Sequence, residues 1–95
     1  MRDDDFEWDD AKAAASFAKH KVSFETAKGV FKDPFAVERE DDREDYDEPR
    51  FTILGMVDGR LFSVVYTLRG ESIRIISARG AEPYEQRLYH EDNSG

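Results

Sequence analysis

The alternation of apolar and polar residues is clearest in the middle of the chain, where it predicts a β-hairpin. Arg50 to Val57 and Arg60 to Leu68 are both rich in apolar and β-branched residues, and Asp58-Gly59 separates them. Asp-Gly between two such runs favours a two-residue hairpin loop, because a type I′ turn requires positive φ at both central positions. A second turn at Arg69 to Glu71, centred on Gly70, predicts a third strand over Ser72 to Ala78.

A two-residue loop fixes the register of the hairpin and assigns each side chain to one face of the sheet. It pairs Val57 with Arg60 and Phe51 with Tyr66. One predicted face is apolar and forms the core: Phe51, Ile53, Val57, Phe62, Val64, Tyr66, Ile73 and Ile75. The opposite face is mixed: Arg50, Thr52, Leu54, Met56, Leu61, Ser63, Val65, Thr67, Arg74 and Ile76.

The mixed face places Arg50, Thr67 and Arg74 in one cross-strand row if Gly70-Glu71 forms the second loop. Two arginines and a hydroxyl in a row suit phosphate binding. The alternative interpretation is that these arginines only decorate a solvated sheet face.

Two helices are predicted before the sheet. Asp9 is placed as an N-cap, and apolar residues at helical spacing follow to about His20, namely Ala11, Ala14, Ala15 and Ala18 with Phe17 alongside. This alanine stripe predicts close approach to a neighbouring element. Ser23 is the predicted N-cap of a second helix, with Phe24, Ala27, Val30 and Phe31 on its apolar side. Asp33-Pro34 ends it, because a residue before proline disfavours the α conformation.

The remaining segments complete an α+β domain with a four-stranded, mostly antiparallel sheet. Phe35 to Glu40 alternates and predicts a short edge strand, and the charged loop Asp41 to Pro49 follows. Ala81 to about Glu91 predicts a C-terminal helix. Helices are expected on the Phe51, Ile53 and Ile75 face of the sheet. We expect one domain over residues 1–95, with residues 1–5 and 92–95 disordered.

Composition changes this picture through charge. The net charge is −8, which by itself argues against a nucleic-acid-binding protein. However, Glu38 to Glu48 holds eight acids and two arginines, whereas Arg50 to Arg79 holds five arginines and two acids. The predicted sheet is therefore basic on an acidic chain. The absence of cysteine and of any membrane-length apolar run fits a cytoplasmic protein with no membrane partner.

Several motifs in one register resemble the BrnT family of toxins, from residue 6 to residue 89. They are Phe6-Glu7-Trp8-Asp9, Lys12, Lys19-His20, Val22-Ser23-Phe24-Glu25, Ala27, Val30 to Pro34, Tyr46, Glu48, Arg50, Gly55, Val64 to Thr67, Ile73 to Arg79, Ala81, Glu85 and Tyr89. The chain departs from the family at three places. Ser16 stands where Asn is usual, Lys21 stands where Gly usually follows the histidine, and the segment after Arg79 lacks the usual arginines.

The resemblance implies a RelE-like ribonuclease fold and the toxin role of a type II toxin–antitoxin system. Such a toxin cleaves RNA and arrests growth until a BrnA-type antitoxin, a ribbon-helix-helix DNA-binding protein, binds it. Operator DNA is then contacted only through the antitoxin. The alternative is a non-catalytic family member that only binds its antitoxin and contributes to transcriptional autoregulation.

RNA cleavage without a metal uses the 2′-hydroxyl as nucleophile and requires a general base, a general acid and cations. Arg50 and Arg79 are the candidate catalytic cations, with Arg74, Lys19 and Thr67 as RNA-binding residues. Arg74 and Arg79 have opposite parity on one strand, so we expect them to share a face only if Arg79 lies beyond the strand end.

His20 is the candidate acid or base, because histidine ordinarily titrates near neutral pH. The alternative is that His20 only caps its helix. Glu85 and Tyr89, at i and i+4, are a candidate proton-transfer pair, although a packing tyrosine beside a surface glutamate fits the same spacing. No cofactor is expected, and no metal site either, because consecutive acids on a loop do not converge on one point.

The apolar residues of the mixed face are the candidate antitoxin-binding surface. They are Leu54, Met56, Leu61, Val65 and Ile76. An exposed surface of this composition predicts a partner. The acidic run from Glu38 to Glu48 would attract a basic antitoxin.

Overall fold

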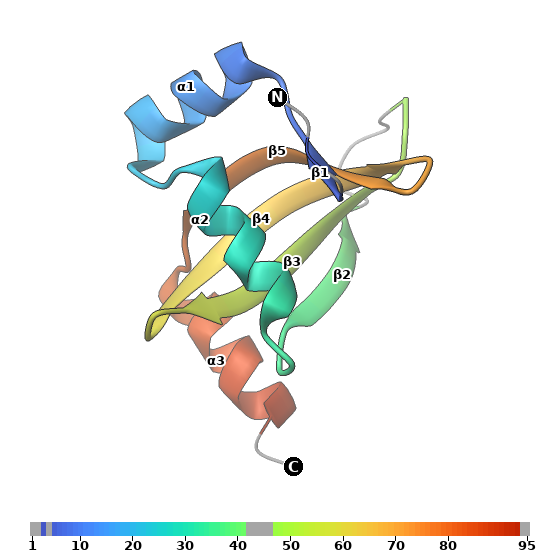
Figure 1. Cartoon of the computed structure of the whole chain (residues 1–95). Coiled ribbons are helices and arrows are strands. Elements are labelled where there is room, and N and C mark those ends of the chain that lie inside the picture. Colours follow the sequence, from blue (N-terminus) through green and yellow to red (C-terminus); the bar gives the residue numbers. More distant parts are fainter. Residues whose placement is uncertain (1–2, 4, 42–46, 94–95) are drawn as a thin grey trace.

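The computed structural model describes residues 3, 5–41 and 47–93 and has an α+β architecture (Figure 1). Residues 1, 2, 4, 94 and 95, which belong to the segments predicted to be disordered, lie outside the described residues, and so does the middle of the acidic loop. The elements in chain order are β1 (Phe6–Glu7), α1 (Asp10–His20), α2 (Phe24–Lys28), the 3₁₀ helix η1 (Gly29–Lys32), β2 (Val37–Asp41), β3 (Arg50–Val57), β4 (Arg60–Arg69), β5 (Ser72–Gly80) and α3 (Pro83–Asn93). None of the helices in these ranges is long and apolar enough to span a membrane.

The two predicted hairpins are confirmed. Asp58 and Gly59 have φ of 51° and 81°, as a type I′ turn requires, and Gly70 in the second turn has φ of 59°. Phe51 pairs with Tyr66 in the predicted register. The antiparallel strands follow one another in space as β5-β4-β3-β2, and β2 is an edge strand as expected.

The prediction of a four-stranded sheet was wrong, because β1 adds a fifth strand at the other edge. Phe6 and Glu7 run parallel to β5, opposite Ile73 and Arg74, so the sheet is mixed. The Ile73 N–H also donates to the carbonyl of Asp5 at 2.8 Å. A two-residue strand is too short to produce an alternation in the sequence, and this is why it was missed.

The first hydrophobic core fills the layer between the N-terminal helices and one face of the sheet. Figure 1 shows α2 and η1 crossing this face. Its buried members are Trp8, Val22, Phe24, Ala27, Val30, Ile53, Phe62, Val64, Tyr66, Ile75 and Ala78. The packing is close: a Cβ on Gly55 would lie 2.7 Å from Val30 Cγ1 and 2.9 Å from the Val30 carbonyl oxygen. The predicted N-caps are confirmed, since Asp9 and Ser23 accept from the backbone N–H groups of Lys12 and Thr26.

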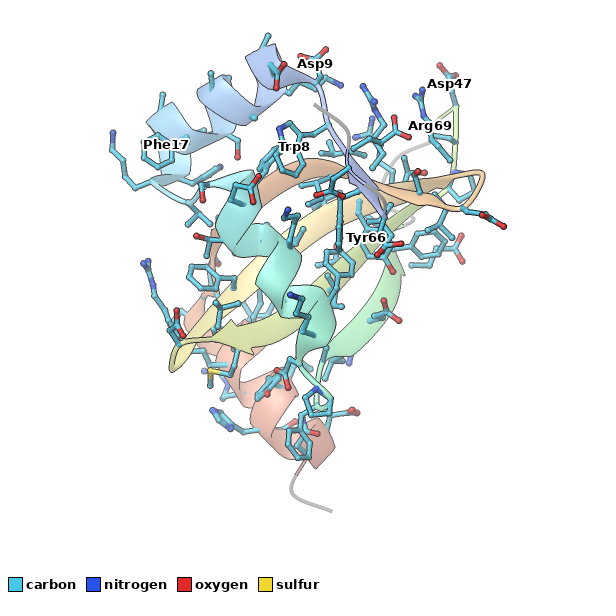
Figure 2. All side chains as sticks on the ribbon, in the orientation of Figure 1. Trp8, Asp9, Phe17, Asp47, Tyr66 and Arg69 are labelled. Carbon is cyan, nitrogen blue, oxygen red and sulfur yellow. The ribbon has the colours of Figure 1, made fainter. Side chains whose placement is uncertain are left out.

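The alanine stripe of α1 does not mediate packing, contrary to the prediction. Ala11, Ala14, Ala15 and Ala18 are exposed, and Phe17 beside them is 49% exposed. Figure 2 places Phe17 on α1 at the periphery, whereas Trp8 and Tyr66 lie in the interior layer. The helix instead packs through Ala13 and Ser16. The polar Ser16 occupies the buried contact position of α1. The buried face of the helix therefore differs from the alanine-rich face that the sequence suggested.

The C-terminal helix α3 lies on the opposite face of the sheet from α2 and η1, where no helix was predicted. It covers a second core cluster of Val37, Leu54, Leu61 and Tyr89, with Met56, Ala81 and Leu88 at its margin. The apolar residues of the mixed face are therefore partly covered by the chain itself. The helix also runs to Asn93, past its predicted end, and the Asn93 amide donates to the Phe35 carbonyl at 3.0 Å.

Candidate functional site

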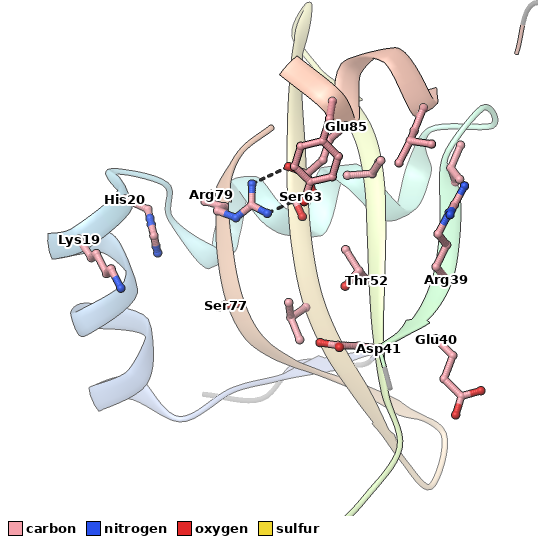
Figure 3. A pocket seen from close by; sticks show the side chains of 15 residues that line it. Lys19, His20, Arg39, Glu40, Asp41, Thr52, Ser63, Ser77, Arg79 and Glu85 are labelled. Carbon is pink, nitrogen blue, oxygen red and sulfur yellow. Dashed lines mark hydrogen bonds and ion pairs between the residues drawn. The ribbon is translucent and has the colours of Figure 1, made fainter. Parts of the chain in front are cut away.

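A pocket of about 490 Å³ opens on the sheet face that carries α3 (Figure 3). The sheet forms its floor, α3 one wall, the end of α1 a second wall, and β2 the far side. The lining residues come from both ends of the chain: Lys19, His20, Val37, Arg39, Glu40, Asp41, Thr52, Leu54, Ser63, Val65, Ser77, Arg79, Tyr84, Glu85 and Leu88.

An irregularity in β5 brings Arg79 to this pocket. Tyr66 pairs with Ile75 and Val65 with Ser77, so Ile76 is an extra residue on β5. A bulge of this kind reverses the parity of the residues that follow it. Arg79 therefore shares a sheet face with Arg74, although it lies within the strand. The expectation that Arg79 had to lie beyond the strand end was wrong for this reason.

Arg79 is held by Glu85 in a two-point ion pair. Its Nη1 lies 2.6 Å from Oε1 of Glu85, and its Nη2 lies 3.1 Å from Oε2. Glu85 is 4% exposed, whereas the side chain of Arg79 retains 31% of its accessible surface. The guanidinium thus has a fixed orientation and an open side toward the pocket. Bidentate pairs of this type are among the stronger charge-assisted hydrogen bonds.

The environment of Glu85 keeps this pair charged. Burial acts to raise the pKa of Glu85, but hydrogen bonds from Arg79, from the Glu82 N–H and from Ser63 outweigh it and leave the pKa below its ordinary value. The hydrogen bond to Glu85 in turn raises the pKa of Arg79. The Glu82 N–H lies 2.9 Å from Oε1, which is one half of a capping box at the start of α3. The Glu85 carboxylate therefore caps the N-terminus of α3 and also orients Arg79.

His20 and Lys19 reach the pocket from the end of α1. Ser16, one turn before His20, docks the helix on β5, because its hydroxyl both donates to the Ala78 carbonyl and accepts from the Ala78 N–H at 3.3 Å. Lys21 then ends α1 in the left-handed conformation, with φ of 61°, and its N–H donates to the Phe17 carbonyl. The helix terminus beside the pocket is thus fixed at two points.

Four predicted RNA-binding or catalytic residues lie outside the pocket lining, namely Arg50, Thr67, Arg74 and Tyr89. The Arg74 guanidinium is paired with Glu7 of β1 at 2.8 Å. The Thr67 hydroxyl is buried and donates to the Pro49 carbonyl at 2.5 Å. Arg50 is half-buried at the start of β3, opposite Asp41 in the register of β2 and β3. The predicted row of Arg50, Thr67 and Arg74 is therefore not an open phosphate-binding surface.

Glu85 and Tyr89 are not brought together as a pair. The Tyr89 hydroxyl donates to the carboxylate of Asp33 at 2.7 Å, and the ring lies in the second core cluster. Burial and this bond raise the pKa of Tyr89 to about 12. Tyr89 therefore anchors α3, whereas Glu85 faces Arg79.

The candidate antitoxin surface is divided by α3. Leu54 and Leu61 are buried beneath or beside the helix, and Met56 lies at the margin of the same cluster. Val65 is half-buried on the pocket floor, and Ile76 is half-buried at the bulge. The expectation that all five are exposed was wrong for Leu54 and Leu61, because the chain supplies its own cover.

Sequence reasoning missed several polar pocket residues. Every second residue of β2, namely Val37, Arg39 and Asp41, lines the pocket. Residues at this spacing lie on one face of a strand. This alternation was present in the sequence, but the acidic run obscured it. Tyr84 was missed because a single tyrosine at the start of a short helix has no distinguishing pattern.

The pocket combines a cationic side with a side of mixed charge on β2, where Arg39 accompanies Glu40 and Asp41. Lys19, His20 and Arg79 come from α1 and β5, whereas Glu40 and Asp41 end β2. Figure 3 shows His20 and Arg79 on the same side of the site and Glu40 at the far edge. Such a site can hold a phosphate near the first group and exchange a proton through the imidazole. Among the described residues, no cluster of three or more His, Asp or Glu side chains is arranged to hold a metal ion.

Two comparisons with known proteins bear on this site. The family model described as the ribonuclease toxin BrnT of type II toxin–antitoxin systems matches residues 8–85, which include His20, Arg79 and Glu85. No curated protein matched the chain.

Proposed function

Because the chain belongs to the BrnT family of ribonuclease toxins of type II toxin–antitoxin systems, we propose that it is a metal-independent endoribonuclease acting at this pocket. The observation that carries the proposal is the convergence of His20, Lys19 and Arg79 in one cavity from distant parts of the chain. Family membership implies RNA as substrate and a protein antitoxin as partner. A RelE-like fold and a cytoplasmic location are part of the same proposal.

In this proposal the cations act on the scissile phosphate. Arg79, oriented by Glu85, binds the phosphate through the guanidinium edge that faces the pocket, and Lys19 adds a second positive charge. As the 2′-hydroxyl attacks, negative charge grows on the non-bridging oxygens. A cation held in place before the reaction stabilises that charge without reorganisation. His20 serves one of the two proton transfers: it takes the proton of the 2′-hydroxyl as the new P–O bond forms, or it gives a proton to the 5′-oxygen as the old P–O bond breaks. Water serves the other transfer.

The antitoxin is proposed to be a BrnA-type ribbon-helix-helix protein that competes with RNA for the same surface. Val65 gives the pocket floor an apolar part, and Arg79 gives it a charge, so one bound segment can occupy both. The exposed carboxylate of Glu40 at the rim complements a basic partner and would raise its association rate. Operator DNA is reached through the antitoxin.

The alternative function is binding of the antitoxin without catalysis. The observation that favours it is that Glu85 already neutralises Arg79, while Glu40 and Asp41 line the same pocket. Both functions predict an antitoxin, so antitoxin binding cannot separate them. RNA cleavage can.

The test is cleavage of a labelled single-stranded RNA by the purified chain in the presence of EDTA. We expect products with a 5′-hydroxyl and a 2′,3′-cyclic phosphate, the ends that attack by the 2′-hydroxyl leaves. His20→Ala should lower the rate, and His90→Ala is the matched control, because His90 is exposed and lies outside the pocket lining. Equal activity of the two histidine variants would remove His20 from the mechanism. No cleavage by the unmodified chain, with no growth arrest on induction without antitoxin, would favour the binding function.

A further inference from the structure

Tyr84 is an aromatic residue that the structure leaves open at the pocket. It is 48% exposed, whereas Tyr89 on the same helix is 6% exposed and packed in the second core cluster. The helix α3 buries Glu85 and Tyr89, so its core-facing side excludes Tyr84. Packing in the core does not account for the position of the Tyr84 ring, because about half of this side chain is exposed to solvent.

The surroundings of Tyr84 are those of a binding position. Tyr84 and Leu88, at i and i+4, are neighbours on the helix surface, and both line the pocket. The next residue, Glu85, holds the guanidinium of Arg79. Tyr84 and Arg79 line the same pocket. An aromatic surface therefore lies beside the cation to which the proposed function assigns the phosphate.

A nucleotide offers a base and a phosphate at a short, fixed separation. Base stacking on an aromatic side chain tolerates all four bases, because every base has a π-face. In an RNA duplex the base faces are occupied by neighbouring bases, whereas an unpaired strand can turn a base onto the protein. An exposed ring next to a phosphate-binding arginine thus selects for single-stranded RNA.

We propose that Tyr84 is a stacking platform for one unpaired base of single-stranded RNA, adjacent to the phosphate bound by Arg79. This inference rests on the proposed function, because it takes RNA as the occupant of the pocket. The role belongs to the face of the ring and not to its hydroxyl. The residue therefore contributes to substrate binding and not to proton transfer.

The experiment uses a short RNA with 2′-O-methyl groups throughout, which the proposed chemistry cannot cleave, and with one 2-aminopurine base. Stacking quenches 2-aminopurine fluorescence, so a titration with the purified chain reports both affinity and stacking. We expect Tyr84→Phe to retain the affinity and the quenching. Tyr84→Ala should bind at least about five-fold more weakly and lose the quenching. Phe35→Ala is the matched control, since Phe35 is 60% exposed but lies outside the pocket lining.

Each other outcome overturns the inference in a distinguishable way. If the unmodified chain does not bind the RNA, the proposed function fails along with the inference. If the chain binds but Tyr84→Ala behaves like Phe35→Ala, only the stacking role fails. If Tyr84→Phe loses as much as Tyr84→Ala, the hydroxyl is the essential group and the platform is wrong. If Tyr84→Ala weakens only antitoxin binding, the ring is a protein-contact residue.

Discussion

The hydroxyl of Tyr89 donates to the carboxylate of Asp33 at 2.7 Å, which ties α3 to the turn that ends η1. Asp33 also accepts from the Met56 N–H and the Phe35 N–H, both at 2.8 Å. One carboxylate thus joins the helix on one face of the sheet, a strand of the sheet and the segment that leads into β2. Its ionised form is the form that these three donors stabilise.

The first prediction concerns acid stability. Burial acts to raise the pKa of Asp33, but its three hydrogen bonds lower it below the ordinary value of 3.8. A depressed pKa contributes stability that is present above pH 3.8 and lost as the pH falls through the folded-state value. Asp33→Asn should therefore lower the free energy of unfolding by about 2 kcal/mol at pH 7. Urea unfolding at pH 7 and pH 3 should find a smaller difference at pH 3, and an equal difference would contradict this account.

The second prediction concerns the alkaline side of the same bond. The pKa of Tyr89 is raised from 10.0 to about 12, so its contribution is present below pH 10 and is lost as the pH rises toward 12. Tyr89→Phe should cost about 1–2 kcal/mol of unfolding free energy at pH 8, and the difference from the unmodified chain should shrink between pH 10 and pH 11.5. Tyr84→Phe is the control, because Tyr84 is exposed. A cost at pH 8 as small as that of Tyr84→Phe would remove the bond from the stability of the fold.

The third prediction compares two arginines at different places. Arg79→Lys keeps the charge but loses the two-point contact with Glu85, and we expect RNA cleavage to fall roughly 100-fold or more, as for loss of one donor to a developing anion. Arg50→Lys should have little effect, because Arg50 lies outside the pocket lining. Initial cleavage rates and thermal unfolding of both variants provide the measurement. A loss of activity in a well-folded Arg50→Lys variant equal to that of Arg79→Lys would place the site elsewhere.

The fourth prediction tests whether α3 covers the mixed face. Leu61 and Leu68 lie on the same strand, but Leu61 is 6% exposed and Leu68 is 57% exposed. Leu61→Ala should cost about 2–4 kcal/mol of unfolding free energy, because it leaves a cavity in the second core cluster. Leu68→Ala should cost less than about 0.5 kcal/mol. Chemical denaturation gives both values, and similar small costs would mean that the helix is not docked there.

The fifth prediction concerns the residue after His20. Lys21 has φ of 61°, a conformation that costs a residue with a Cβ about 1 kcal/mol relative to glycine. Lys21→Gly should therefore raise the free energy of unfolding by about 1 kcal/mol. Ala15→Gly, in the exposed middle of the same helix, should lower it by a similar amount. If both glycines destabilise equally, the left-handed cap is not what determines the end of α1.

The sequence was most informative where a few adjacent residues determine the backbone conformation. Asp58-Gly59, Gly70, Asp9 and Ser23 were identified correctly, because a turn or a cap depends on a few adjacent residues. Hairpin register followed from the turn, and the core face followed from the register. These steps involve no information from distant parts of the chain.

The rest depended on contacts between distant segments. The bulge at Ile76 places Arg79 on the pocket face of the sheet. No residue type in β5 predicts such a bulge. The apolar mixed face was correctly recognised as unsuited to solvent, but whether a partner or α3 covers it is a tertiary question. The site residues divided accordingly: Arg79, His20, Lys19 and Glu85 came together, whereas Arg50, Arg74, Thr67 and Tyr89 found other neighbours.

The pocket is built from residues near both ends of the chain, and this has a consequence for protein synthesis. Lys19 and His20 leave the ribosome early, but the arginine beside them and the glutamate that orients it come at positions 79 and 85. Likewise, β1 can pair only after β5 has been synthesised. Contacts of long sequence separation also form slowly, because the intervening chain must first be closed into a loop. A nascent chain therefore carries no complete pocket until nearly all of it has been translated. Under the proposed function, this leaves an interval in which an antitoxin made nearby can be present before the pocket is assembled.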